Sequence, residues 1–354
     1  MGSSLKYIVF AAIVWLFVVP LAGAQDPSVP NTESQGLVRL RSDYFWVDKD
    51  KGRFREDQWR TDGFTGGIER LELSSQGPDD KGYEWQLQGR ALYEHDYALS
   101  LLMTKKDSHY LLLDFMGWRR YFDGSNEAWD ASVPSLAEKA DSDFFVDHDT
   151  YNIEFGLTPE QGPTFILGWE RFVKDGQEVL LRGADGISAG SQTFSSIPTV
   201  AQIKGITDEL YAELAYTWAE IYNVRLRQEF EQYRDDQRLD ISSYDINGAV
   251  NHADLVNDDL GYTNWRTLLM FDSFLNEENY VTANYMYNDL DNDSTRDIVG
   301  YHEVTTDSGG SSRKTHVGAF AYQGERFANI DHLSLVAGIR IEDSQTQARM
   351  AGSS

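Results

Sequence analysis

The sequence predicts an all-β chain, and more specifically a transmembrane antiparallel up-and-down β-barrel of the bacterial outer membrane. Three observations predict it. Apolar and polar residues alternate with a period of two along much of the chain. The alternating segments run to about ten residues, the length that a tilted strand needs to cross a bilayer, whereas soluble strands average about five or six. The connections between these segments alternate between short and long.

The composition removes several other classes of protein. The chain has 354 residues, with 57 Asp and Glu against 31 Lys and Arg, a formal charge of −26, and no Cys. Without Cys there is no disulfide scaffold, thiolate metal site, Cys nucleophile or covalently attached c-type haem. The negative charge makes nucleic acid a poor partner. Aromatic residues make up 13% of the chain, which is too many for a disordered protein.

The first residues have the features of an export signal. Lys6 precedes an apolar run over 7–19, and Ala22-Gly23-Ala24 is a small-residue cleavage site. An uncleaved anchor is the alternative, but the run is shorter than the ~20 residues of a spanning helix. We expect three regions and an outer-membrane location in a Gram-negative-type cell. The regions are a signal peptide over 1–24, a flexible periplasmic lead-in over 25–36 and a β-barrel domain over 37–354.

The alternation places the strands. In 207–219, for example, Leu210, Leu214 and Trp218 fall on one side, and Glu209 and Glu213 fall on the other. The expected strands are 38–47, 67–75, 83–93, 97–105, 109–121, 149–157, 164–173, 207–219, 222–233, 263–275, 279–288, 314–323 and 331–342. The tryptophans expected on the lipid-facing side or in interfacial girdles are Trp46, Trp85, Trp169, Trp218 and Trp265.

The expected connections favour a membrane barrel over a secreted β-sandwich or β-helix, which stays the alternative. Outer-membrane barrels have short periplasmic turns and long outer loops, whereas a sandwich has no reason to collect its long loops at one end. The stretch 177–182 is assigned to a loop, although it could form a further strand. The long connections are 48–66, 122–148, 174–206, 234–262 and 289–313, and the short ones are 94–96, 158–163, 220–221, 276–278 and 324–330.

The number of expected strands is odd. Bacterial single-chain barrels usually have an even number, with both termini in the periplasm. We therefore expect the chain to be the N-terminal part of a longer barrel, incomplete at its C-terminus.

Charged residues opposite the apolar side are candidates for the lumen wall. Glu209 and Glu213 lie on a strand next to Arg225 and Arg227, and Arg90 is a further positive candidate. Opposite charges on neighbouring strands can pair. Two interpretations stay open, a structural ladder that holds the wall and a charged ring that sets ion selectivity.

Asp289, Asp291 and Asp293 form a D-x-D-x-D run in an expected outer loop. Alternate carboxylates suit Ca²⁺, which takes oxygen ligands. The run lacks the Gly and Glu of an EF-hand loop, so a solvated loop is the alternative. Acidic residues also dominate 122–148 and 234–262, where they would gather divalent cations or attract a basic partner.

No group of residues points strongly to catalysis, and we expect a non-enzymatic protein with no cofactor of its own. Asp147-His148-Asp149 near the expected rim could belong to a hydrolase, and His316 with Ser334 could form a base–hydroxyl pair. Polar residues are expected at a rim and in a lumen in any case. No P-loop, G-x-S-x-G or H-E-x-x-H motif is present.

Two hairpins carry a resemblance to a known family. The run VDHDTYNIEFGLTP at 146–159 is followed by TFILGWERF at 164–172, KDGQ at 174–177 and RQEFEQY at 227–233. This pattern resembles the MtrB/PioB-type outer-membrane β-barrel family. In that family a strand ends in a G-L/F-x-P turn and returns through x-x-G-x-E-R/H before a Gly/Asp-rich loop. The resemblance covers roughly 83–235.

The resemblance implies a large barrel, longer than this chain, that acts as a sheath. Well-studied members surround a multihaem c-type cytochrome and let electrons cross the outer membrane, so haem would enter only through that partner. Some members carry an N-terminal C-x-x-C, which this chain lacks. We expect a sheath or pore in outer-membrane lipid. A passive diffusion porin for small solutes or ions is the alternative, and a hydrolase at the rim is less favoured.

Overall fold

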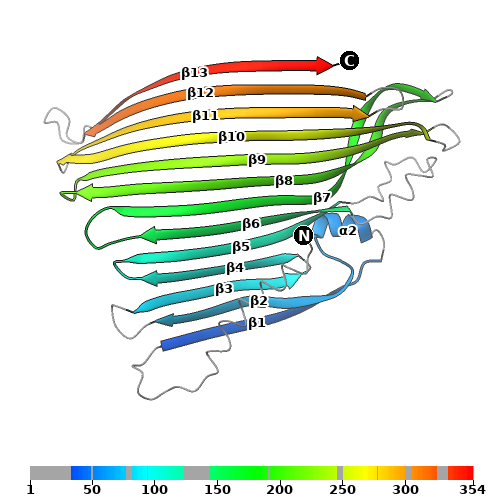
Figure 1. Ribbon diagram of the computed structural model, residues 1–354. Coiled ribbons are helices and arrows are strands. Elements are labelled where there is room, and N and C mark those ends of the chain that lie inside the picture. Colours follow the sequence, from blue (N-terminus) through cyan, green and yellow to red (C-terminus); the bar gives the residue numbers. More distant parts are fainter. Residues whose placement is uncertain are drawn as a thin grey trace.

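The computed structural model describes residues 33–48, 51–76, 82–93, 95–122, 144–189, 192–244, 250–276, 278–299, 304–324 and 334–353. In these ranges the chain forms one antiparallel sheet of thirteen strands, each paired with its neighbours in the sequence (Figure 1). The elements are β1 (Glu33–Phe45), α2 (Lys51–Gln58), β2 (Gly63–Gln76), β3 (Tyr83–Tyr93), β4 (Asp96–Lys105), β5 (His109–Phe122), β6 (Phe144–Leu157), β7 (Thr164–Ala189), β8 (Gln192–Trp218), β9 (Tyr222–Tyr244), β10 (Val250–Asn276), β11 (Asn279–Val299), β12 (Val304–Gly324) and β13 (Leu335–Ser353).

The all-β class and the antiparallel meander are confirmed, and each expected strand has its counterpart in the sheet. The strand order is linear from β1 to β13. Within the described residues these two edges are not hydrogen-bonded to each other, so the sheet is not closed into a barrel. In the same ranges, no helix combines the length and the apolar character that crossing a membrane would demand.

Three of the expected long connections are wrong. Most of 174–206 belongs to β7 and β8, most of 234–262 to β9 and β10, and most of 289–313 to β11 and β12. Asp, Asn, Gly and Ser are typical of loops, and polar side chains lie on both faces here, so the sequence shows no clear alternation. Backbone pairing continues all the same, and cross-strand ion pairs such as Arg296 with Asp258 support it (Nε–Oδ1 2.7 Å).

Smaller differences concern the N-terminal part. The connection 48–66 contains the helix α2, and β2 already begins at Gly63. The expected lead-in over 25–36 overlaps β1, which begins at Glu33. The rest of that lead-in, the expected signal peptide over 1–24, and 123–143, the larger part of the connection 122–148, lie outside the described residues.

The two faces of the sheet differ in polarity, and the register of the strands shows which residues lie on each face. Phe165, Leu214, Leu226 and Leu269 stand opposite one another on successive strands, and we call their side the apolar face. The other side, which carries Glu209, we call the polar face. Because successive residues of a strand point to opposite sides, each strand contributes to both faces.

Two small apolar clusters are buried. One lies on the apolar face of β2 to β4 around Leu87, which is fully buried. The other lies on the polar face, in the long extensions of the strands. It joins Val146 on β6 with Ile203 on β8, Leu239 on β9 and Val256 on β10. Its members stand on successive strands, and Gly176 of β7 lies between Val146 and Ile203.

Candidate functional site

An apolar band crosses the apolar face from β6 to β13. Its middle row runs over successive strands through Phe165, Leu214, Leu226, Leu269 and Tyr285, which are 36% to 46% exposed. Soluble monomers rarely leave so continuous an apolar surface uncovered. The band is therefore a surface that needs a covering partner.

Aromatic residues border the band on both sides. On the side of the long extensions, Trp169, Phe230 and Trp265 share one row, and the rings of Phe230 and Trp265 lie 4.6 Å apart. On the side of the short turns, Trp218 stacks on Tyr222 at 5.0 Å. Eight residues separate the two rows along β8, or about 26 Å of strand.

Charged residues begin at the aromatic row on the side of the long extensions. Asp289 stands opposite Trp265 in that row and pairs with Lys314 at 3.4 Å, and Arg171 pairs with Asp208 directly beyond it (Nε–Oδ1 2.7 Å). Inside the band, Gln228 and Thr267 are polar but bond to each other at 2.7 Å. The apolar surface therefore has a limited height and ends sharply on the side of the long extensions.

The structure brings four of the predicted wall charges together on the polar face. Arg225 pairs with Glu213 (Nε–Oε1 3.2 Å), and Arg227 lies 3.7 Å from both Glu209 and Glu213. Sequence reasoning did not select Glu229, which receives Arg227 at 2.6 Å and Arg266 at 2.8 Å. The sequence showed on which strands these charged residues lie and how they are spaced. Which of them pair depends on the register between the strands, which the sequence does not show.

A second group on the polar face links β5, β6 and β8. The hydroxyls of Tyr110 and Tyr211 both donate to Glu154, the first at 2.6 Å. Each ring lies across a glycine of the adjacent strand: Tyr110 stands opposite Gly156, and Tyr211 opposite Gly168. The guanidinium of Arg227 lies 4.3 Å above the Tyr211 ring, so the tyrosine group and the charged group form one continuous network.

Arg90 lies apart from this network. It pairs with Asp96 at 3.2 Å and lines a hollow of about 660 Å³ on the polar face of β2 to β7. The structure thus places all five wall candidates on one face, although only four of them are in contact.

Asp289, Asp291 and Asp293 do not lie in a loop. They occupy alternate positions of β11, so they point to one face at a spacing of about 7 Å. Asp289 is held by Tyr287 and Lys314. Among the described residues no group of three or more His, Asp or Glu is arranged to hold a metal. Calcium at this run stays a prediction that its strand geometry does not support.

A stack of rings joins α2 to the polar face. Trp59, just after α2, stacks on Trp118 at 5.4 Å, and Trp118 stacks on His148 at 4.0 Å with planes 5° apart. The backbone of Trp59 has φ +56°, a helix-ending conformation that favours glycine. α2 contacts β5 and lies beside the ends of β5 and β6 (Figure 1). The β1–β2 connection therefore reaches past the short β3–β4 hairpin and is anchored on the sheet.

Neither predicted catalytic arrangement is formed. His148 points to the polar face, where burial in the ring stack and the nearby Lys174 and Arg120 lower its pKa. Asp147 points to the other face and pairs with Arg119 at 2.6 Å. His316 stands opposite Asp343, whereas Ser334 precedes the first residue of β13, about 30 Å further along the strand.

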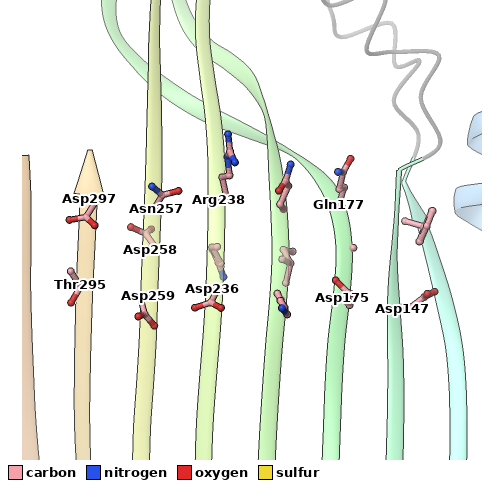
Figure 2. Close-up of a pocket in the computed structure, with 16 residues that line it drawn as sticks. Asp147, Asp175, Gln177, Asp236, Arg238, Asn257, Asp258, Asp259, Thr295 and Asp297 are labelled. Carbon is pink, nitrogen blue, oxygen red and sulfur yellow. The ribbon is translucent and has the colours of Figure 1, made fainter. Parts of the chain in front are cut away.

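An acidic hollow of about 860 Å³ lies beyond the charged border of the band. Its lining side chains come from strands β6 to β11 (Figure 2). Lys204 and Arg238 are the basic residues that line it, and its acidic residues are Asp147, Asp175, Asp236, Asp258, Asp259 and Asp297. The sequence predicted acidic loops here, and the structure instead places the acids of 234–239 and 255–262 on paired strands.

Comparison of the sequence with protein-family models and with curated proteins gives no match. The resemblance to the MtrB/PioB-type barrels therefore stays a hypothesis drawn from the two hairpins.

Proposed function

We propose that this chain forms the wall of an outer-membrane β-barrel, with its apolar face toward lipid and its polar face toward the interior. The single observation that carries the proposal is the exposed apolar band with its two aromatic borders. Strands tilted by 35–45° would bring its height of about 26 Å along the strand to roughly 20 Å, compared with about 25 Å for the apolar band of known outer-membrane barrels.

The polar face supports the same proposal. Lipid cannot hydrogen-bond to exposed backbone, so a sheet that spans a bilayer has to close, and its inner side can then be charged. The network from Tyr110 to Arg266 is suited to such an inner wall, because each of its arginines is paired with a glutamate and its tyrosine hydroxyls are bonded. Closure of the sheet is part of the proposal.

The apolar band predicts which tryptophans contact lipid. In vesicles with brominated acyl chains, which quench tryptophan emission on contact, Trp265→Phe should lower the quenched fraction because it removes a band residue. Trp59→Phe should raise that fraction, because Trp59 lies outside the band and contributes unquenched light. Equal fractions in both variants and the unchanged protein would contradict the proposed orientation.

Two roles fit such a wall, a sheath for a partner and a passive pore. The family resemblance favours the sheath around a multihaem cytochrome, and the paired wall charges are compatible with either role. The visible absorption spectrum of the complex extracted from its native membrane separates them. We expect a haem band that co-purifies with the chain, whereas a colourless complex would leave the diffusion porin as the better proposal.

A further inference from the structure

A row of oxygen-bearing side chains crosses the polar face at one level. Glu170 on β7, Glu209 on β8 and Glu231 on β9 stand directly opposite one another. Asn152 on β6 and Asn264 on β10 continue the row at its two ends. Like charges directly opposite one another destabilise a sheet, so the row needs a compensating positive charge.

Each end of this row carries a side-chain amide. The Nδ2 of Asn152 donates to Asp114 on β5 at 3.5 Å, and Asn152 stands opposite Glu170 on β7. Asn264 is only 8% exposed and stands beside Glu231. Both Oδ1 atoms are buried and have no hydrogen-bond partner in the part of the chain that the structure describes. Ionised carboxylates cannot donate a hydrogen bond to a buried amide oxygen beside them. Such an oxygen is, however, a good ligand for a cation.

The arginines of the wall do not balance its acids. Glu170 makes no ion pair among the described residues, and Arg227 is divided among Glu209, Glu213 and Glu229. Glu209 lies just beyond the apolar band.

There is also space beside the row. Asp114, Asn152 and Glu170 line the hollow of about 660 Å³ on the polar face, together with Arg70 and Arg90. An ion with part of its water shell can therefore approach the β6–β7 end of the row.

We propose that the row Asn152–Glu170–Glu209–Glu231–Asn264 binds divalent cations, Ca²⁺ or Mg²⁺, each of which keeps part of its water and bridges two neighbouring strands. Opposite side chains in a sheet start about 5 Å apart, and these carboxylates do not converge into a closed cage. A bridging, partly hydrated ion fits that spacing. The site is a property of the sheet, and it does not depend on the proposed membrane function.

The test is thermal unfolding of the purified full-length chain in detergent, with and without millimolar Ca²⁺ or Mg²⁺. Ligands that bind only the folded state raise its melting temperature, and we expect a rise of several degrees. The double variant Glu209→Gln/Glu231→Gln should lose this rise. Without cation it should melt at or above the temperature of the unchanged protein, because the repulsion is relieved. Asp291→Asn/Asp293→Asn removes the same charge from β11 and should keep the rise.

A second measurement uses Tb³⁺ and needs no variant. Tyr262 donates its hydroxyl to Glu231, so Tb³⁺ bound in the row should show tyrosine-sensitised emission that Ca²⁺ displaces. No melting shift and no sensitised emission would overturn the proposal. It would also be overturned if the Asp291/Asp293 variant, rather than the glutamate variant, lost the shift. Neither result bears on the lipid-quenching experiment, so the two proposals can fail separately.

Discussion

Phe320→Arg is expected to prevent stable insertion of the chain into a bilayer. Phe320 lies within the apolar band on β12, between Ala283 and Ile339, and is 49% exposed. About half of this residue is exposed, so the substitution places the charge in contact with the surroundings of the sheet. The row of Phe320 lies between the middle row of the band and the border of Trp218. An arginine on the lipid face costs about 2–4 kcal/mol at the middle of a bilayer, so the expected loss reaches at most roughly 30-fold to nearly 1,000-fold in the folding equilibrium. The fraction of chain that becomes protease-resistant in lipid vesicles measures this effect.

Ala321→Arg is the matched control. It introduces the same charge one residue later, on the polar face, where Ala321 stands between Thr282 and Gly338. A charge directed toward an aqueous interior should leave insertion nearly unchanged. Equal losses for the two variants would mean that the faces are not divided between lipid and water, and the proposed function would then fail.

The sequence was most informative where one face of the sheet is apolar. Leu210, Leu214 and Leu226 alternate with charged residues, because one side of each strand faces apolar neighbours and the other does not. This pattern located β8 and β9 within the band. Beyond the band both faces are polar, and backbone pairing there is supported by contacts such as Arg296–Asp258, which depend on register. Period-two alternation therefore could not show where these strands end.

The sequence predicted which charged residues share the polar face, but it did not predict which of them pair. Alternation placed Arg225 and Arg227 opposite the apolar side, and strand order placed them near Glu213. Glu229 receives Arg227 of its own strand and Arg266 of β10, and this second contact requires knowing which residue of β10 stands opposite Glu229. The row that ends in Asn264 could not be predicted for the same reason, because it is defined by the register of five strands.

Gly168→Ala is expected to be among the most destabilising small substitutions in the sheet. A Cβ built on Gly168 would lie 2.1 Å from Cζ of Tyr211, far inside van der Waals contact. The ring would have to leave the surface of β7, and its hydroxyl would lose Glu154. Overpacking costs typically 1–3 kcal/mol, and a hydrogen bond to a charged group contributes about 1.5–3 kcal/mol. We expect a loss of about 2–4 kcal/mol in the free energy of unfolding, measured by denaturant titration.

Gly318→Ala provides the control, because a Cβ at Gly318 on β12 meets no atom within 4 Å. Its expected effect is within about 1 kcal/mol, in either direction. The decisive comparison adds Gly168→Ala to a chain that already carries Tyr211→Ala. With the ring absent, the added methyl has nothing to displace and should cost little, so the two substitutions should be strongly non-additive. Simple additivity would show that the backbone of β7 itself needs a glycine at position 168. It would contradict the view that Gly168 makes room for the ring of Tyr211, which reaches from β8 over β7 to Glu154 on β6.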